Sequence, residues 1–338
     1  MHHLAVDLGS RQSHFCIRTP EGQVEKEARI PNSQLPKLFA LVPQSRVVLE
    51  TSSECFVVAD MARQAGHLVN VVPAALAPSL GVGQRGVKTD KRDAENLSLA
   101  SCRMETLPSV HVPSPEAREW RALLTSRDAL VTTRTRLINS VKGWMRTQLL
   151  RVKAGSTSTF PKRARELATE LSLRLPAHIE WLLVTLETLN EQIALANAAV
   201  KAATSKDAAC VRLMTVPGVG PTTALSFRAA VDDVSRFKRP PALQSYLGLT
   251  PGERSSGEKR NKVGITKAGS VNTRRMLVQA AWVAYVQKPD EPMVQWARRL
   301  SEHKPKQVAV TALARKMVGI LFALWRDGTN YDAAHKKT

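Results

Sequence analysis

The sequence predicts an α/β domain at the N-terminus, then an α-helical coiled-coil region and a mainly α-helical C-terminal domain. Short apolar runs separated by turn residues fill the first 72 residues, which is typical of strands. From residue 116 onward, apolar residues recur every three or four positions, as on one face of a helix. A proline-rich stretch at 107–115 separates the two patterns. We expect domains at 1–112, 113–207 and 208–338.

Five strands and two helices are expected before residue 73. The strands are expected at 4–8, 14–18, 23–30, 46–50 and 67–72, and the second helix at 54–65. Asn32 or Ser33 should cap the first helix, which ends at Leu41. A further helix should run from about Asp90 to Arg103. This order matches the ribonuclease H-like architecture, in which the first and fourth strands lie side by side.

Acidic residues occupy unexpected places in these elements. Asp7 lies near the end of the first apolar strand, and Glu50 lies near the end of the fourth. A charge in a buried strand is costly unless it is paired or coordinates a metal. Asp90 and Asp93 are three residues apart at a helix start, so they should point to one side. We therefore expect one site of four carboxylates that binds Mg²⁺ or Mn²⁺ for an in-line phosphoryl displacement.

Two other interpretations of these residues stay open. The acidic pair and its basic neighbours could be a capped helix start with a solvated charge run. The turn at 7–10 could bind phosphate as in a sugar kinase or an actin-like ATPase, although the sequence lacks the second glycine-rich phosphate loop of such folds.

Charge and cysteine usage narrow the class of protein. Lys and Arg outnumber Asp and Glu by 49 − 29 = 20, which indicates a polyanionic partner, most simply nucleic acid. No apolar stretch approaches the roughly 20 residues of a membrane span, so we expect no membrane partner. The four cysteines form no C-x-x-C pair and the histidines show no metal-binding spacing, which argues against zinc and for the reducing cytoplasm.

Two long helices are expected in the middle region. The first, at 116–150, should have an apolar face that includes Leu149, and a basic face that either contacts phosphates or is simply solvated. The basic face comprises Arg118, Arg121, Arg127, Arg134, Arg136, Lys142 and Arg146. The second helix carries a 3-4 spacing of apolar residues, which predicts a coiled-coil seam that pairs within the chain or with a second subunit. That seam comprises Ile179, Leu182, Leu186, Leu189, Ile193, Ala196 and Val200.

Glycines and basic residues mark the C-terminal domain. Gly218 and Gly220 lie in a segment like a helix-hairpin-helix, whose glycine amides can bind backbone phosphate; an ordinary packed turn is the alternative. Ser255 and Ser256 precede Gly257 in a basic stretch, where a serine could be a nucleophile or part of a turn. We expect nucleic-acid contacts from Lys88, Lys91, Arg92, Arg254, Lys259, Arg260, Lys262, Lys267, Arg274 and Arg275.

Together these motifs resemble the transposases, or recombinases, of insertion sequence 110 type over nearly the whole chain. In the N-terminal half, Val6-Asp7-Leu8-Gly9, Leu49-Glu50-Thr51 and Lys88-Thr89-Asp90-Lys91-Arg92-Asp93-Ala94 look like the Asp-Glu-Asp-Asp set of that family on a RuvC-like fold. In the C-terminal half, the resemblance rests on 216–221, 246–251, Ser256-Gly257 and 265–269, with Arg274 and Arg275 beyond.

The resemblance implies an enzyme that cuts and rejoins DNA. It implies that the four carboxylates bind Mg²⁺ and that Ser256, or its neighbour Ser255, attacks a DNA phosphodiester to form a phosphoserine. It also implies a structured bridge RNA that pairs with donor and target DNA, a homodimer joined through the helical middle, and a tetramer on two synapsed DNAs. Such a protein would be cytoplasmic, bacterial and associated with the nucleoid.

A serine hydroxyl needs a base or a metal, and no residue near Ser256 in sequence supplies one. We therefore expect the carboxylates to complete its site, from the same protomer or from another. A RuvC-like junction nuclease that cuts with metal-activated water and forms no covalent intermediate is the alternative enzyme. A non-enzymatic nucleic-acid-binding protein would explain the charge, but not the two carboxylates in apolar strands.

Overall fold

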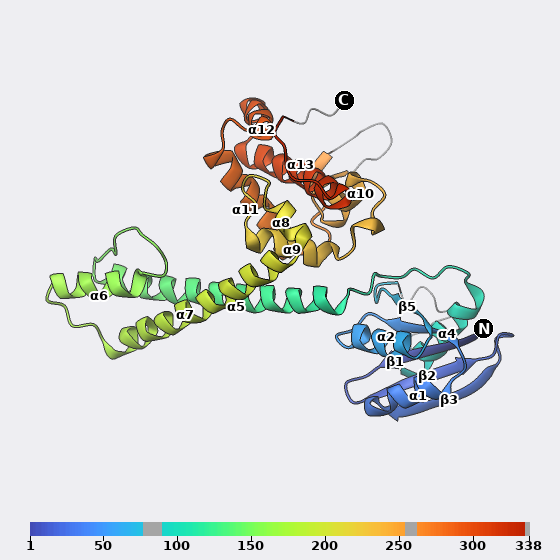
Figure 1. Ribbon diagram of the computed structural model, residues 1–338. Helices are drawn as coiled ribbons and strands as arrows, with labels where there is room; N and C mark the ends of the chain where they lie inside the picture. Colours follow the sequence, from blue (N-terminus) through green and yellow to red (C-terminus); the bar gives the residue numbers. More distant parts are fainter. Residues whose placement is uncertain (77–89, 254–261, 335–338) are drawn as a thin grey trace. The chain divides into compact units, whose positions relative to one another are not determined.

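The computed structural model describes residues 1–76, 90–253 and 262–334, apart from the side chains of Asp90 and Lys262 (Figure 1). The chain divides into two compact units, Met1–Pro113 and Ser114–Thr338. The division into three domains stays a prediction. The four cysteines are free thiols.

A five-stranded mixed sheet forms the centre of the first unit. Its strands are β1 (His2–Leu8), β2 (Gln12–Arg18), β3 (Val24–Pro31), β4 (Ser45–Glu50) and β5 (Leu68–Val72), in the order β3-β2-β1-β4-β5. Strands β1, β4 and β5 are parallel, whereas β2 and β3 run antiparallel to their neighbours. The predicted five strands, and the adjacency of the first and fourth of them, are confirmed.

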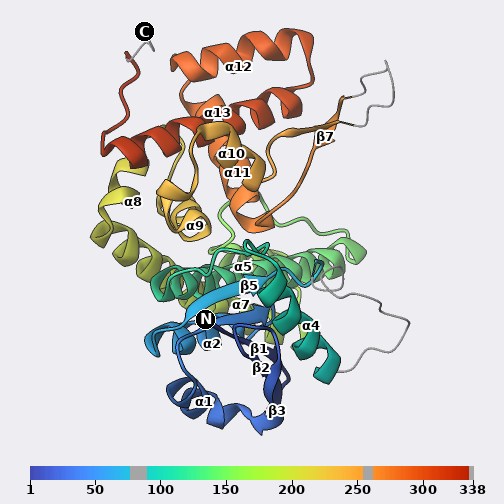
Figure 2. The same ribbon diagram turned by 90° about the vertical axis from the view of Figure 1, so that its right-hand side faces the viewer.

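Helices cover both faces of this sheet (Figure 2). The η1 turn (Asn32–Gln34), α1 (Leu35–Leu41) and α2 (Cys55–Gln64) lie on one side, and α4 (Asp90–Arg103) lies on the other. Alternation along the strands separates the two layers, because successive side chains point to opposite faces. Leu4 and Val6 belong to the core under α1 and α2, whereas Ala5 packs with Leu97 of α4.

The predicted cap of the first helix is wrong. Gln34 precedes α1, and no side chain caps that helix. The Asn32 side chain instead donates to the Gly9 carbonyl (2.9 Å) and accepts from the Ser13 hydroxyl (2.7 Å). Asn32 therefore connects the end of β3 to the chain between β1 and β2, through hydrogen bonds to residues distant in sequence.

The second unit is mostly helical, as predicted. It contains α5 (Pro115–Thr147), α6 (Phe160–Glu170), α7 (Ala177–Lys206), α8 (Ala208–Leu213), α9 (Pro221–Val231), η2 (Val234–Arg236), α10 (Pro240–Tyr246), α11 (Val271–Gln287), α12 (Pro292–His303) and α13 (Lys306–Asp327). A two-stranded antiparallel ribbon joins β6 (Pro251–Glu253) to β7 (Lys262–Ile265). The long helices α5 and α7 pack against each other within the chain (Figure 1).

The register of α7 differs from the predicted seam. Its buried residues are Ile179, Leu183, Leu186, Ile193, Val200 and Thr204. Leu182, Leu189 and Ala196, which the apolar pattern favoured, are only partly buried. Leu149 is also not part of an apolar face, since it follows the end of α5 and is 94% exposed. The coiled coil itself stays a prediction.

Helix α13 corrects the expectation about apolar stretches. It is long and apolar enough, by length and composition alone, to cross a membrane, with half of its apolar window buried. Leu321 and Phe322 are fully buried in the large core of the second unit. A core helix of a globular domain passes the same test, so the finding is weak evidence for a membrane span.

Candidate active site and nucleic-acid-binding residues

The pairing of β1 with β4 positions two of the predicted carboxylates. In the parallel register, Ala5 lies opposite Val48, and both side chains belong to the small core beneath α4. Asp7 and Glu50 follow two residues later on their strands, so they share that face because side chains alternate. Both are partly buried. The sheet therefore brings Asp7 and Glu50 to the carboxyl ends of adjacent strands, on the side that α4 covers.

Helix α4 contributes Asp93 from its first turn. The helix packs against β1 and β2 through a buried stripe that includes Ala94, Leu97 and Ser98. Asp93 immediately precedes this stripe and is partly buried. Among the residues that the structure describes, no three His, Cys, Asp or Glu side chains form a group able to hold a metal ion. The side chain of Asp90 is outside that description, so the four-carboxylate site stays a prediction.

An ion-pair cluster beside these carboxylates was missed at the sequence level. The Lys91 ammonium lies 3.0 Å from Glu27 Oε1, and His14 Nε2 lies 3.5 Å from the same oxygen. Burial raises the pKa of Glu27, but the hydrogen bond and charge of Lys91 outweigh that effect, so the pKa is lowered overall. The alternation of side chains along β3 could have revealed Glu27. It lies opposite Cys16, which in turn lies opposite Ala5, so its side chain points to the face of the sheet that α4 covers. Lys91, which we expected to contact nucleic acid, thus attaches the start of α4 to β3.

Further hydrogen bonds fix α4 along its length. Arg18 Nε donates to the hydroxyl of buried Ser98 (2.9 Å), and His3 Nδ1 lies 2.8 Å from the hydroxyl of Ser101. Arg46 donates to the carbonyl of Met104 just beyond the helix (2.8 Å). Burial, followed by the nearby charge of Arg46, lowers the pKa of His3. The helix that carries Asp93 is therefore held to the sheet at its start, middle and end.

The predicted nucleophile and several basic residues lie outside the described residues. These are Lys88, Arg254, Ser255, Ser256, Lys259 and Arg260. The backbone of Lys262 pairs with Glu253 across the β6–β7 ribbon. Lys267 and Arg92 are exposed, and Lys267 adopts a positive φ of 58°.

Two neighbouring arginines at the start of α11 have partners within the chain. Arg274 is only 8% exposed, and its guanidinium donates to the carbonyls of Ala268 (2.6 Å) and Leu247 (3.3 Å). Arg275 forms an ion pair with Asp128 of α5. Arg274 therefore organises the turn before α11, a role that the count of basic residues does not reveal.

The two glycines before α9 differ in their surroundings. Gly218 has a φ of +85°, and a Cβ there would lie 2.3 Å from the carbonyl oxygen of Ala280 on α11. Gly220 is the N-cap of α9, and a Cβ there would meet no atom within 4 Å. Close packing accounts for Gly218, whereas Gly220 leaves open space at a helix N-terminus. The helix-hairpin-helix description and its phosphate contacts stay predictions.

The basic face of α5 is not uniformly directed at solvent. Arg121 Nε donates to the carbonyl of Ala229 (2.8 Å), and burial lowers the pKa of Arg121. Arg127 and Arg134 donate to side-chain oxygens of α7, those of Asn197 (2.6 Å) and Asn190 (3.3 Å). Arg121, Arg127 and Arg134 therefore have partners within the chain, and the phosphate-facing surface stays a prediction. Arg136, Lys142 and Arg146, in the second half, are exposed.

Comparison with known proteins identifies the family. The model described as "Transposase IS116/IS110/IS902 family" matches residues 210–297, and a transposase model of the IS110 DEDD type matches residues 4–148. The chain is 32% identical over 333 residues to the transposase for insertion sequence element IS1111A of Coxiella burnetii, covering 95% of this chain and 88% of that protein.

Two further relatives are similar over most of their length. The transposase for insertion sequence element IS1328 of Yersinia enterocolitica is 28% identical over 342 residues, with 96% of this chain and 97% of that protein covered. A probable family 20 transposase of Pseudomonas aeruginosa is 29% identical over 311 residues, with 90% of each covered. The chain therefore belongs to the IS116/IS110/IS902 family of insertion sequence transposases, enzymes that cut and rejoin DNA.

Proposed function

We propose that this transposase cuts DNA through a phosphoserine on Ser256, aided by a divalent metal held by Asp7, Glu50, Asp90 and Asp93. The observation that carries the proposal is the parallel pairing of β1 with β4, which sets Asp7 and Glu50 on one face at adjacent strand ends. Two partly buried carboxylates side by side repel each other unless a cation or a proton is shared between them.

The residues present fit a hard divalent cation. Carboxylate oxygens are the ligands that Mg²⁺ and Mn²⁺ prefer in proteins, and α4 brings Asp93 to the same face of the sheet. When bound, Mg²⁺ would neutralise negative charge on the phosphate oxygens. The carboxylates would fix the position of that charge because their strands and helix are tied together by Arg18, His3 and Lys91.

In the serine step, one phosphorus–oxygen bond of the DNA is exchanged for a phosphorus–oxygen bond to the serine. The Ser256 oxygen forms a bond to phosphorus as the bond from phosphorus to the DNA 3′ or 5′ oxygen breaks. The hydroxyl proton passes to a base, and the released DNA oxygen takes up a proton. Attack by a DNA hydroxyl on the phosphoserine then reverses the exchange and rejoins a strand without an external energy source.

We also propose that a structured bridge RNA selects the donor and target DNA, and that a homodimer assembles into a tetramer on the synapsed DNAs. The formal charge of +20 suits a protein that holds more than one nucleic acid. A guide RNA would read sequence by base pairing, and the protein would then bind mainly phosphates and duplex shape. Purified protein should therefore carry one discrete RNA species; recovery of heterogeneous RNA alone would contradict guidance.

A covalent adduct tests the chemistry. Labelled DNA, Mg²⁺ and the full-length protein should give a denaturation-resistant protein–DNA adduct that disappears in Ser256→Ala. Asp7→Asn and Glu50→Gln should also abolish it, whereas Glu54→Gln is the control because this exposed acid lies just outside the sheet. Survival of the adduct in Ser256→Ala but not in Ser255→Ala would move the nucleophile by one residue. Free nicks without an adduct in the unmodified protein would instead favour the junction nuclease.

A further inference from the structure

A basic pocket lies where α5 ends and the chain turns back toward α6. We call this segment, from Val141 to Arg163, the hairpin tip. The pocket has a volume of about 280 Å³. It is lined by Lys142, Met145, Arg146, Leu150, Arg151 and Val152. Three cationic and three apolar side chains thus line one small cavity.

No acidic residue accompanies these cations in the sequence. Residues 129–165 contain nine Lys or Arg and no Asp or Glu. Lys142, Arg146 and Arg151 are exposed, and in the described part of the chain none of them forms an ion pair. The Lys142 ammonium lies 5.7 Å from the centre of the Phe160 ring. Three like charges around one cavity raise its positive potential, and an anion would relieve that repulsion.

Helix electrostatics account for only part of the pattern. Arg146 lies in the last turn of α5, where a cation interacts favourably with the negative end of the helix dipole. Lys142 lies one turn earlier, and Arg151 lies beyond the end of the helix, so this effect does not explain their convergence. A solvated surface would also not require the three side chains to share one cavity.

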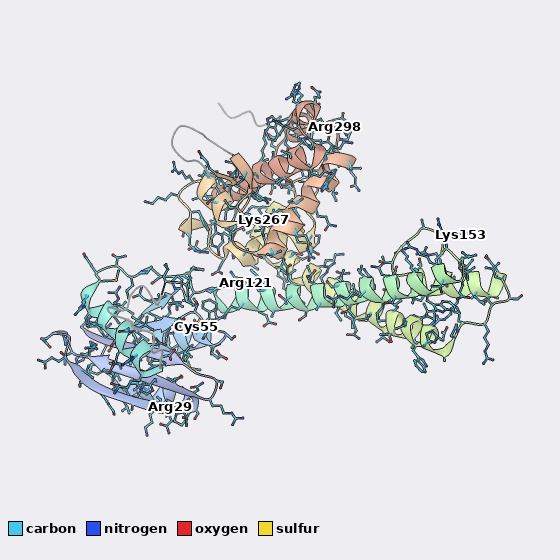
Figure 3. All side chains as sticks on the ribbon, turned by 180° about the vertical axis from the view of Figure 1, so that it is seen from behind. Arg29, Cys55, Arg121, Lys153, Lys267 and Arg298 are labelled. Atoms are coloured by element: carbon cyan, nitrogen blue, oxygen red, sulfur yellow. The ribbon has the colours of Figure 1, made fainter. Side chains whose placement is uncertain are left out.

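The loop that forms the pocket is held in place by its own contacts. The Leu150 amide donates to the Met145 carbonyl (2.9 Å), which turns the chain back at the end of α5. The Arg163 guanidinium donates to the carbonyls of Lys153 and Ser156, the latter at 2.6 Å. A Cβ at Gly155 would lie 2.8 Å from Arg163 Cζ, the far end of a flexible side chain, so the guanidinium would have to shift if a larger residue stood there. Lys153 marks the loop in Figure 3.

We propose that the hairpin tip pocket binds a phosphodiester phosphate of a nucleic acid, with the adjoining sugar against Leu150 and Val152. Guanidinium groups and a lysine ammonium are the usual donors to phosphate oxygens. The volume lies just below the roughly 300–1,000 Å³ of ordinary ligand pockets, which suits a phosphate with its sugar better than a larger ligand. This site is additional to the residues that carry the proposed chemistry.

The experiment compares two variants that lose the same charge. The pocket variant is Lys142→Gln, Arg146→Gln and Arg151→Gln in the full-length chain. The control variant is Arg136→Gln, Lys153→Gln and Arg174→Gln, three exposed cations of the second unit that do not line the pocket. Binding of a single-stranded RNA, the single-stranded DNA of the same sequence and a DNA duplex is measured by fluorescence anisotropy at several salt concentrations.

We expect the pocket variant to bind at least one probe about 10- to 100-fold more weakly, the range for loss of charged hydrogen bonds. Its salt dependence for that probe should fall by about one phosphate contact more than that of the control. The affected probe identifies RNA or DNA as the source of the phosphate. Equal losses in both variants, or no loss in either, would overturn the proposal.

Two controls show that weaker binding does not come from misfolding and does not depend on the proposed phosphoserine chemistry. Melting curves check that each variant is folded, and if the pocket variant is not, the single variant Arg151→Glu replaces it because this exposed residue lies outside the helices. That variant should weaken binding of the same probe, and unchanged binding would overturn the proposal. No strand cutting is measured, so failure here leaves the phosphoserine proposal intact.

Discussion

Replacement of Gly218 by alanine should destabilise the second unit, because this glycine is needed for packing. Its φ of +85° is a left-handed conformation, which costs an L-residue about 1–2 kcal/mol. The new Cβ would also lie 2.3 Å from the Ala280 carbonyl oxygen and 3.0 Å from the Ala284 amide nitrogen of α11. Forcing such an overpacked contact apart costs about 1–3 kcal/mol. The free energy of unfolding should therefore fall by about 2–5 kcal/mol, out of the roughly 5–15 kcal/mol typical of a domain.

Thermal unfolding of the full-length chain measures this effect. For a unit of this size we expect the melting temperature of Gly218→Ala to fall by roughly 4–20 °C. Gly220→Ala is the matched control, since its φ is −97° and no atom lies within 4 Å of the new Cβ. Its cost should be about 1 kcal/mol, the difference between glycine and alanine at an N-cap. If Gly218→Ala melts like the unmodified protein, the packing argument fails; if that variant also loses DNA binding, the phosphate-binding interpretation of Gly218 gains support.

Three further predictions concern side chains whose contacts stabilise the first or the second unit internally. Lys91→Glu and Glu27→Lys should each lower strand cutting severalfold by loosening the start of α4, and combining them should restore part of it, measured by adduct yield. Stability should decline as the pH falls below about 6.5, because the lowered pKa of His3 means that the unfolded chain binds more protons there; His3→Gln should reduce this dependence in melting curves. Arg274→Met should lower the free energy of unfolding by about 1–3 kcal/mol by leaving buried carbonyls without a donor, whereas Arg275→Gln, at an exposed pair, should cost less than about 1 kcal/mol in the same urea titration.

Much of the first unit follows from local pattern. Short apolar runs interrupted by turn residues indicate where the strands lie, and successive side chains of a strand point to opposite faces. Their order matches the ribonuclease H-like architecture, and for that reason Asp7 and Glu50 could be assigned to one site before their strands were seen to pair. The role of Asn32 could not be predicted in this way. Its partners, Gly9 and Ser13, lie about twenty residues earlier, and only the folded sheet brings them within hydrogen-bond distance.

The α7 seam shows how apolar periodicity can select the wrong register. Both registers include Ile179, Leu186 and Ile193, and they differ by one residue at the alternate positions. Leucine count favours the predicted register, because the other contains Asn190 and, further along, Asn197. Those amides are partners of arginines on α5, so polar pairs occupy positions where the apolar rule expects leucine. A pattern that scores only hydrophobicity cannot detect such complementary pairs.

The sequence also does not show which basic residues are paired within the chain and which can bind phosphate. Lys91 and Arg275 have ion-pair partners, and Arg274 is buried against carbonyls. Residues 262–289 around Arg274 and Arg275 contain no acidic residue, just as the stretch around Lys142 and Arg151 contains none, so their partners could not be found from the sequence nearby. A cation whose donors are satisfied inside the chain releases few counterions from DNA, so the formal charge of +20 overstates the number of phosphate contacts. Cations without acidic partners in the described part of the chain, such as Lys142, Arg146 and Arg151, should therefore contribute more to the salt dependence of binding than their share of the total charge.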